Sequence, residues 1–188
     1  MNPPSKKIRP QLTHAGLWVR DMETMIDFYA RVLDFDVSDR GFVPRYGGRI
    51  AFLSNDPTIH HQIVFAEGRA DDSPSTINQL SFTVESLDAL REMHQRAVDA
   101  GAANLLPRNH GNAWSVYFDD PEGNNIEVYL DSPFHIPQPF GELLDFALSN
   151  EEILQATEKR VREVEGFMPR GEWSAERAKV MGLTDKAT

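Results

Sequence analysis

The residue with the clearest chemical potential is Glu127, which lies in the apolar run Ile126-Glu127-Val128 of a predicted strand. Burying a carboxylate costs on the order of several kcal/mol unless the group is hydrogen-bonded or bound to a cation. We therefore expect Glu127 to face a metal ion. The chain contains no cysteine, so the other ligands would be imidazole, carboxylate or neutral oxygen, which suit iron(II), manganese(II) or zinc(II).

Two candidates for these ligands, His14 and Gln79, occupy equivalent places in an internal repeat. Residues 12–14 align with residues 77–79 at a shift of 65 residues. If the two repeats pack about a pseudo-twofold axis, their first and last strands line one cleft, where His14, Gln79 and Glu127 converge. This set is close to the two-histidine, one-carboxylate arrangement of non-haem iron oxygenases, with an amide replacing one imidazole.

Three further side chains could transfer protons in the same cleft. His61 opens the last strand of the first repeat, and His110 and Tyr117 flank the last hairpin of the second. Imidazole and phenol groups can each donate or accept a proton or a hydrogen bond. Each residue alone is as readily a surface histidine or a core aromatic, so the joint occurrence of the three favours a catalytic role.

The first repeat follows a strand, helix, three-strand pattern. Alternation predicts a strand over residues 12–19, and Asp21 can cap the helix that follows it. The helix has an apolar stripe made of Met22, Met25, Ile26, Tyr29 and Leu33. Further strands are predicted over residues 35–38, 49–53 and 62–66.

The same pattern begins again after a polar linker over residues 67–75. The predicted elements are a strand over 77–84, a helix from Ser86 to about Gly101, and strands over 113–118 and 125–130. Trp18 and Trp114 are assigned to the core, the commoner use of such large side chains. His94 and His135 are placed outside the cleft.

These patterns predict an α+β fold with a C-terminal helical extension. Residues 1–10 form a tail, residues 11–132 form one domain of two βαβββ modules (11–67 and 76–132), and residues 133–188 form the extension. A capping-box pattern at 149–152 predicts a helix to about 164, and a second helix is predicted over 173–181. The extension could cover an apolar surface, close the site or reach a second subunit.

The net negative charge of the chain disfavours some classes of binding partner. The chain has 29 acidic and 19 basic side chains and a formal net charge of -10, so nucleic acid is an unfavourable partner. No stretch approaches the roughly 20 apolar residues that span a bilayer, and no signal peptide is recognisable. We expect a cytoplasmic protein without membrane contact that acts on a small molecule.

Four segments of this pattern occur together in one known family. They are Ile59–Phe65, Ile77–Gln79, Asn109–Phe118 and Asp120–Glu127. In these segments, and in their order, the sequence resembles type I extradiol dioxygenases of the vicinal-oxygen-chelate (glyoxalase, bleomycin resistance, extradiol dioxygenase) superfamily. The likeness covers about residues 10–132, and it implies two βαβββ modules that form one metal-binding cleft.

The resemblance also implies a ligand set. His14 falls on the first metal histidine and Glu127 on the metal carboxylate, with iron(II) as the expected ion and manganese(II) as the alternative. Gln79 stands where the family has its second metal histidine. An amide oxygen can bind a divalent ion but donates less strongly than imidazole, so this departure affects the affinity and tuning of the metal.

The remaining roles implied by the resemblance concern the substrate. His61 falls on the acid-base histidine beside the dioxygen site, and His110 and Tyr117 fall on residues that contact the substrate hydroxyls. The implied reaction opens the ring of a catechol-like aromatic substrate with O2. Small members of the fold usually pair, so we expect a homodimer.

Two other functions fit the same fold. A glyoxalase-like, metal-dependent isomerase or lyase is favoured slightly by Gln79, because glyoxalases of the superfamily offer a glutamine ligand. A metal-free protein that binds an aromatic molecule is the third possibility. Glu127 argues against it, because an emptied cleft would leave a carboxylate buried without a partner.

Overall fold

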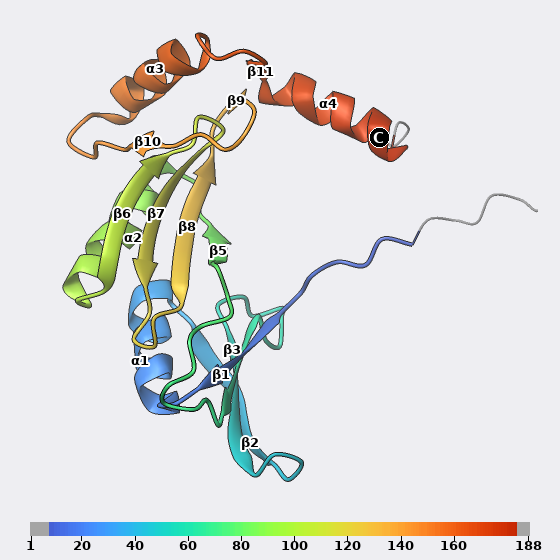
Figure 1. Ribbon diagram of the computed structural model, residues 1–188, viewed down its shortest axis with the longest axis vertical. Coiled ribbons are helices and arrows are strands. Elements are labelled where there is room, and N and C mark those ends of the chain that lie inside the picture. The colour runs from blue at the N-terminus through green and yellow to red at the C-terminus, as the bar shows by residue number, and fades with distance from the viewer. Residues whose placement is uncertain (1–7, 184–188) are drawn as a thin grey trace, which may run out of the picture. The chain divides into compact units, whose positions relative to one another are not determined.

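The computed structural model describes residues 8–183, which divide into two compact units between Ser73 and Pro74 (Figure 1). Within these residues, the first unit combines one mixed sheet with one helix, and the second combines a mixed five-stranded sheet and a two-stranded sheet with three helices, which confirms the predicted α+β class. Residues 1–7 of the predicted tail and residues 184–188 of the predicted extension lie outside the described residues.

The first unit has the expected βαβββ order. Its elements are β1 (Ala15–Val19), α1 (Met22–Leu33), β2 (Asp36–Val43), β3 (Gly48–Ser54) and β4 (Ile63–Glu67). The strand order is β1-β4-β3-β2, with β1 parallel to β4 and the other pairs antiparallel. The predicted start of β1 at residue 12 is wrong, because β4 begins opposite Ala15 and offers no earlier pairing partner.

The core of the first unit lies between α1 and the sheet. Asp21 accepts a hydrogen bond from the Thr24 amide and begins α1, as predicted. The Tyr29 ring on α1 meets Phe65 of β4 edge to face at a centroid distance of 5.0 Å, and both side chains are fully buried. Each such burial stabilises the unit by about 1.5–3 kcal/mol.

The assignment of Trp18 to this core is wrong. Leu17 and Val19 point into the core, so the period of two residues along β1 turns Trp18 to the opposite face. Its side chain is 51% exposed and makes an edge contact with Tyr46 at a centroid distance of 4.9 Å. Trp18 lies between Leu17 and Val19 in the strand, and this alternation of faces outweighs the general tendency of tryptophan to be buried.

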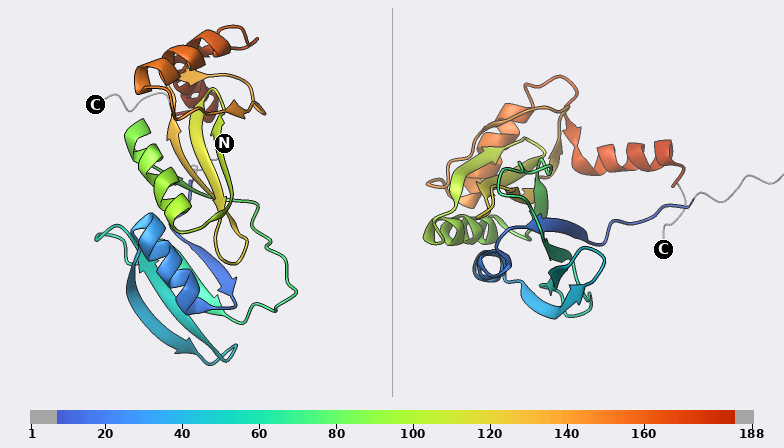
Figure 2. Two further views of the ribbon diagram at one scale, coloured as in Figure 1. Left: turned by 90° about the vertical axis from the view of Figure 1, so that its left-hand side faces the viewer. Right: turned by 60° about the horizontal axis from the view of Figure 1, so that its bottom comes forward.

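The second unit repeats the arrangement of the first. Its elements are β5 (Leu80–Thr83), α2 (Leu87–Asp99), β6 (Ala103–Asn109), β7 (Ala113–Asp119) and β8 (Asn125–Asp131). Strand β5 pairs parallel with β8, as β1 does with β4, and α2 lies along one face of β6, β7 and β8 (Figure 2). β1 and β5 begin at Ala15 and Leu80, and α1 and α2 at Met22 and Leu87, so the 65-residue repeat is confirmed.

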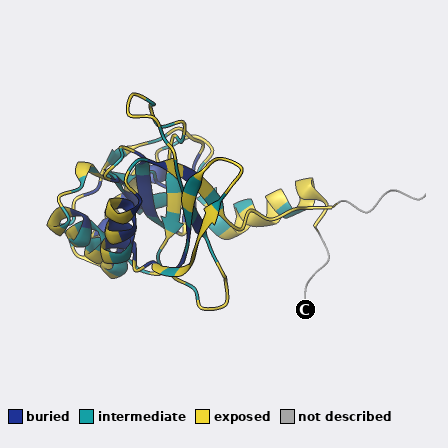
Figure 3. Cartoon of the chain, turned by 90° about the horizontal axis from the view of Figure 1, so that it is seen from below, coloured by how far each residue is buried: buried dark blue, intermediate teal, exposed yellow. Residues whose placement is uncertain are grey.

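The extension that follows β8 packs on one end of this sheet (Figure 1). Its elements are β9 (Phe134–His135), β10 (Glu142–Leu143), α3 (Asn150–Val161), β11 (Met168–Pro169) and α4 (Arg170–Met181). The predicted capping box is present, because Ser149 and Glu152 each accept a hydrogen bond from the other's backbone amide. Strand β10 adds to the sheet beside β6, whereas α4 buries none of its residues (Figure 3).

None of the helices described within residues 8–183 combines the length and the apolar character needed to cross a membrane.

Candidate functional site

Glu127 lies on β8 at the centre of a cluster of hydrogen-bond donors in the second unit. Its side chain is 8% exposed, which confirms the predicted burial. Oε2 accepts from Ser81 Oγ at 2.6 Å and from Gln79 Nε2 at 2.9 Å. Oε1 accepts from Tyr117 Oη at 2.5 Å and from Ser115 Oγ at 2.9 Å. The carboxylate is therefore partnered on both oxygens.

The strand register explains this cluster. Ser81 of β5 and Tyr117 of β7 both stand directly opposite Glu127, one on each side of β8. A carboxylate offers about four acceptor positions, and four donors occupy them here. The expectation that Glu127 would be buried without a partner unless it held a cation is therefore wrong, because neutral donors already stabilise the charge.

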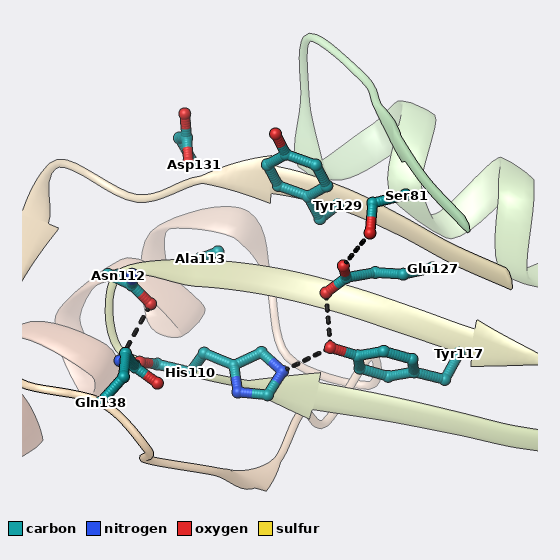
Figure 4. Close-up of a pocket in the computed structure, with 9 residues that line it drawn as sticks. All are labelled: Ser81, His110, Asn112, Ala113, Tyr117, Glu127, Tyr129, Asp131 and Gln138. Carbon is teal, nitrogen blue, oxygen red and sulfur yellow. Dashed lines mark hydrogen bonds between the residues drawn. The ribbon is translucent and has the colours of Figure 1, made fainter. Parts of the chain in front are cut away.

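A chain of hydrogen bonds leads from Glu127 to His110 (Figure 4). Tyr117 Oη lies 3.0 Å from His110 Nε2, and His110 Nδ1 lies 2.7 Å from the Phe140 carbonyl oxygen. Burial, and then the hydrogen bond to Glu127, raises the pKa of Tyr117, so its phenol stays protonated at neutral pH. Tyr117 therefore keeps one proton, which its hydroxyl donates to Glu127.

The three hydrogen-bonded residues His110, Tyr117 and Glu127 line a pocket of about 390 Å³ (Figure 4). Glu127, Tyr129 and Asp131 alternate along β8 and share its pocket face. The full lining consists of Ser81, His110, Asn112, Ala113, Tyr117, Glu127, Tyr129, Asp131 and Gln138. Gln138 belongs to the extension, so the pocket wall includes a residue from outside the predicted two-module domain.

The first unit brings together the two other predicted residues, His14 and His61. The His14 side chain is exposed immediately before β1, and its ring centroid lies 4.5 Å from that of His61. His61 Nδ1 lies 2.9 Å from His60 Nδ1. Partial desolvation, followed by the charges of His14 and His60, lowers the pKa of His61, so its imidazole is neutral at neutral pH.

Each unit thus assembles its own part of the predicted set. His14 and His61 meet in the first unit, and Gln79, Glu127, Tyr117 and His110 are linked in the second. His14 and Gln79 each directly precede the first strand of their unit. The ligand set takes members from both units, and it stays a prediction.

Sequence reasoning missed Ser81, Ser115 and Gln138. Ser115 carried the same signal as Glu127, because it is a polar residue inside the apolar run Trp114-Ser115-Val116, and it is fully buried. Trp114 is buried as predicted. Ser81 and Gln138 carried no such signal, because both are exposed and owe their contacts to strand register and to the path of the connector.

The donor chemistry of the second unit fits a divalent ion in part. Within residues 8–183, no three His, Asp or Glu side chains gather closely enough to hold a metal ion by themselves. Glu127 and Gln79 are in contact, and turning the Gln79 amide over would bring its oxygen beside Glu127 Oε2. A carboxylate and an amide oxygen are suitable ligands for a divalent ion, and an imidazole such as that of His14 would complete the expected set.

A family model, the Glyoxalase/Bleomycin resistance protein/Dioxygenase superfamily, matches residues 11–128. The chain belongs to this superfamily. It is 26% identical over 130 residues to biphenyl-2,3-diol 1,2-dioxygenase 3 of Rhodococcus globerulus, a match that covers 66% of this chain and 65% of that protein. The chain thus spans slightly less than two thirds of that relative. The extension, residues 133–188, lies beyond the residues that match the family model.

Solved structures of the superfamily share the fold. The glyoxylase/bleomycin resistance protein/dioxygenase domain from Frankia sp. EAN1pec is 26% identical, with a TM-score of 0.54, over 66% of this chain and 99% of that one. The fosfomycin resistance protein FosX from Listeria monocytogenes, complexed with manganese(II) and sulfate, is 18% identical, with a TM-score of 0.52, over 66% of this chain and 95% of that one. The second likeness concerns the fold alone.

Proposed function

We propose that this chain is a metal-dependent, extradiol-type dioxygenase that opens the ring of a catechol-like substrate with O2. The observation that carries the proposal is the hydrogen-bonded chain from His110 through Tyr117 to Glu127 on the wall of the pocket. It places two groups able to hydrogen-bond substrate oxygens beside a carboxylate able to hold a metal. The similarity to a biphenyl-2,3-diol dioxygenase supports the substrate class.

We propose Glu127, Gln79 and His14 as the metal ligands, with iron(II) as the expected ion and manganese(II) as the alternative. When bound, the ion would neutralise charge on the two substrate oxygens and bring the substrate and O2 into one coordination sphere. Ligation by Gln79 requires its amide oxygen, so the hydrogen bonds that its nitrogen donates to Glu127 and Ser81 would be given up.

The protonation states of His61 and Tyr117 fit this chemistry. Because its pKa is lowered, His61 begins neutral and can take a proton from a substrate hydroxyl before it returns one to the product side. Tyr117 keeps its single proton and can donate it to a substrate oxygen in exchange for the hydrogen bond to Glu127. His61 is therefore assigned proton transfer, and Tyr117 and His110 are assigned substrate binding.

Specific observations favour each alternative. Gln79 favours a glyoxalase-like isomerase or lyase, in which the same ion would stabilise a chelated oxyanion without consuming O2. The four donors to Glu127 favour a metal-free binding protein, because they remove the cost of an unpaired buried carboxylate. The homodimer expected from small members of the fold stays a prediction.

The deciding experiment uses the purified full chain. Its metal content is measured, the protein is reconstituted without oxygen using iron(II) or manganese(II), and oxygen uptake is recorded on a panel of catechols. Stoichiometric metal with catechol-dependent uptake and a yellow ring-fission product supports the dioxygenase. Bound metal without oxygen uptake moves the assignment to the isomerase or lyase, and the failure of both metals to bind moves it to the binding protein.

Substituting Gln79→His is expected to tighten metal binding, because imidazole is the stronger donor and occupies this position in the family's ligand set. The dissociation constant for manganese(II) should fall by about tenfold, which corresponds to about 1.4 kcal/mol. The measurement is a titration followed by electron paramagnetic resonance. Gln95→His, on the exposed face of α2, is the matched control, and an equal response in both variants would remove Gln79 from the ligand set.

A further inference from the structure

The turn that carries His110 is held by the C-terminal extension. We propose that the extension is a positioning element, which fixes one tautomer and one orientation of the His110 imidazole in the pocket. The extension lies beyond the residues that match the family model, so the match assigns it no role. The importance of His110 to catalysis rests on the proposed function, whereas the constraint on its ring does not.

The first set of contacts acts on His110 directly. Its Nδ1 lies 2.7 Å from the Phe140 carbonyl oxygen, and its own carbonyl accepts a hydrogen bond from Gln138 Nε2 at 2.9 Å. A carbonyl oxygen can only accept, so Nδ1 must carry the proton. The other ring nitrogen, Nε2, is then an acceptor 3.0 Å from Tyr117 Oη, and it receives the single phenol proton when that proton turns from Glu127 Oε1 toward His110. The extension thus selects the ring nitrogen that is presented to the pocket.

The second set of contacts converges on Thr157 of α3, whose side chain is 1% exposed. Its Oγ1 accepts hydrogen bonds from Asn109 Nδ2 and Trp114 Nε1, both at 2.9 Å, and donates to the Ile153 carbonyl at 2.8 Å. One donor and two acceptor positions are all that a hydroxyl offers, and each is used. Asn109 ends β6 and Trp114 lies near the start of β7, so both sides of the turn are tied to one atom.

The third attachment is steric and involves Gly111. Its φ of +73° lies in the region that favours glycine, and a Cβ there would stand 2.5 Å from Ile136 Cδ1 and 2.9 Å from Val161 Cγ1. Ile136 and Val161 belong to the small core of the extension. Ser132 Oγ also donates to the Gly111 carbonyl at 2.5 Å. The turn at Gly111 therefore packs against the extension, which restricts its conformation more than that of an exposed hairpin loop.

Positioning of the His110 ring can be distinguished from general stabilisation of the second unit. Thr157 does not line the pocket, yet it is bonded to the residues on both sides of His110 and Gly111. If the extension only stabilised the second unit, its loosening would lower stability and leave the imidazole in the same tautomer. If it positions His110, the tautomer itself must respond, and the ring nitrogens report this directly.

The test combines two variants of the full chain. Thr157→Val keeps the shape of the side chain and removes the hydroxyl, and Gln138→Ala removes the amide that holds the His110 carbonyl. Nitrogen-15 spectra of the histidine rings are recorded above the ordinary imidazole titration range, together with kcat and KM for a catechol and the metal content. Thr83→Val, an exposed threonine on β5, is the matched control.

The parent protein is expected to show His110 as a single tautomer protonated at Nδ1. Both variants should give a mixture of tautomers and a kcat lowered by about tenfold, with unchanged metal content, whereas Thr83→Val should match the parent. A parent ring protonated at Nε2, or a single Nδ1 tautomer retained in Gln138→Ala and in Thr157→Val where it folds, overturns the proposal. The spectra decide this even if the parent consumes no oxygen, so failure of the proposed dioxygenase activity is recognised separately.

Discussion

Substituting Glu127→Gln is expected to abolish stoichiometric metal binding and to lower catechol-dependent oxygen uptake by at least about 100-fold. The proposed ion contributes several kcal/mol of charge stabilisation, and each 1.36 kcal/mol corresponds to about tenfold in rate. A neutral amide oxygen replaces the only carboxylate of the proposed ligand set, so the site loses its one anionic ligand. Metal analysis and oxygen uptake of the purified variant give both quantities.

The same substitution should also destabilise the second unit, which gives an independent measurement. Tyr117 and Ser115 donate to Oε1, and Gln79 and Ser81 donate to Oε2. An amide nitrogen cannot accept a hydrogen bond, so one of these pairs must lose its acceptor. A loss of about 1–3 kcal/mol in the free energy of unfolding is expected, measured by denaturant titration.

Glu85→Gln is the control for Glu127→Gln. It makes the same change of charge at an exposed residue between β5 and α2. It should leave metal content, oxygen uptake and unfolding close to those of the parent. Full metal stoichiometry in Glu127→Gln would contradict the assigned ligand, and a stability loss without any metal in the parent would favour the metal-free binding protein.

The parts of the fold that the sequence predicted are those governed by local periodicity. Helix α1 and its Asp21 cap, and the Ser149 capping box of α3, follow from residues within a few positions of one another. Strand β6 was missed because Pro107 and Asn104, which has a positive φ, interrupt the alternation that marks a strand. Its place between β7 and β10 is set by tertiary pairing that no local pattern records.

The candidate site divides in the same way. The burial of Glu127 follows from its apolar neighbours, so it could be predicted. Its donors could not, because Ser81 lies 46 residues away and reaches it only through the parallel register of β5 and β8. The contact of His110 with Phe140 likewise depends on the course of the connector between β9 and β10, for which proline content gives only an extended conformation.

The two units carry different residues at equivalent positions of the repeat. Gly16 pairs with Val64 in the first unit as Ser81 pairs with Glu127 in the second. The first unit therefore has no hydroxyl and no carboxylate at these equivalent positions. Elsewhere the first unit presents the imidazoles of His14 and His61, and the second unit presents the carboxylate and hydroxyl groups together with the imidazole of His110.

Substituting His61→Ala is expected to lower kcat/KM for the catechol by about 100- to 10,000-fold, the usual range for the loss of a general acid-base group. Metal content should stay unchanged, because His61 is not among the proposed ligands. Steady-state kinetics on the metal-loaded protein measure the first quantity, and metal analysis measures the second. A variant that turns over the catechol at the parent rate would remove His61 from the mechanism.

The assignment of His61 as a proton acceptor predicts how activity depends on pH. Partial desolvation, with the charges of His14 and His60, lowers the pKa of His61 below 6.5, and only the neutral ring can accept a proton. Activity should therefore persist as the pH falls to 6.5 and be lost below it, so the acidic limb of kcat/KM lies under that value. His60→Ala, the adjacent exposed histidine, should stay active near neutral pH and move the limb upward, because one charge that depresses the pKa of His61 is gone. Equal losses of activity in His60→Ala and His61→Ala would instead indicate that the two histidines stabilise the segment that precedes β4.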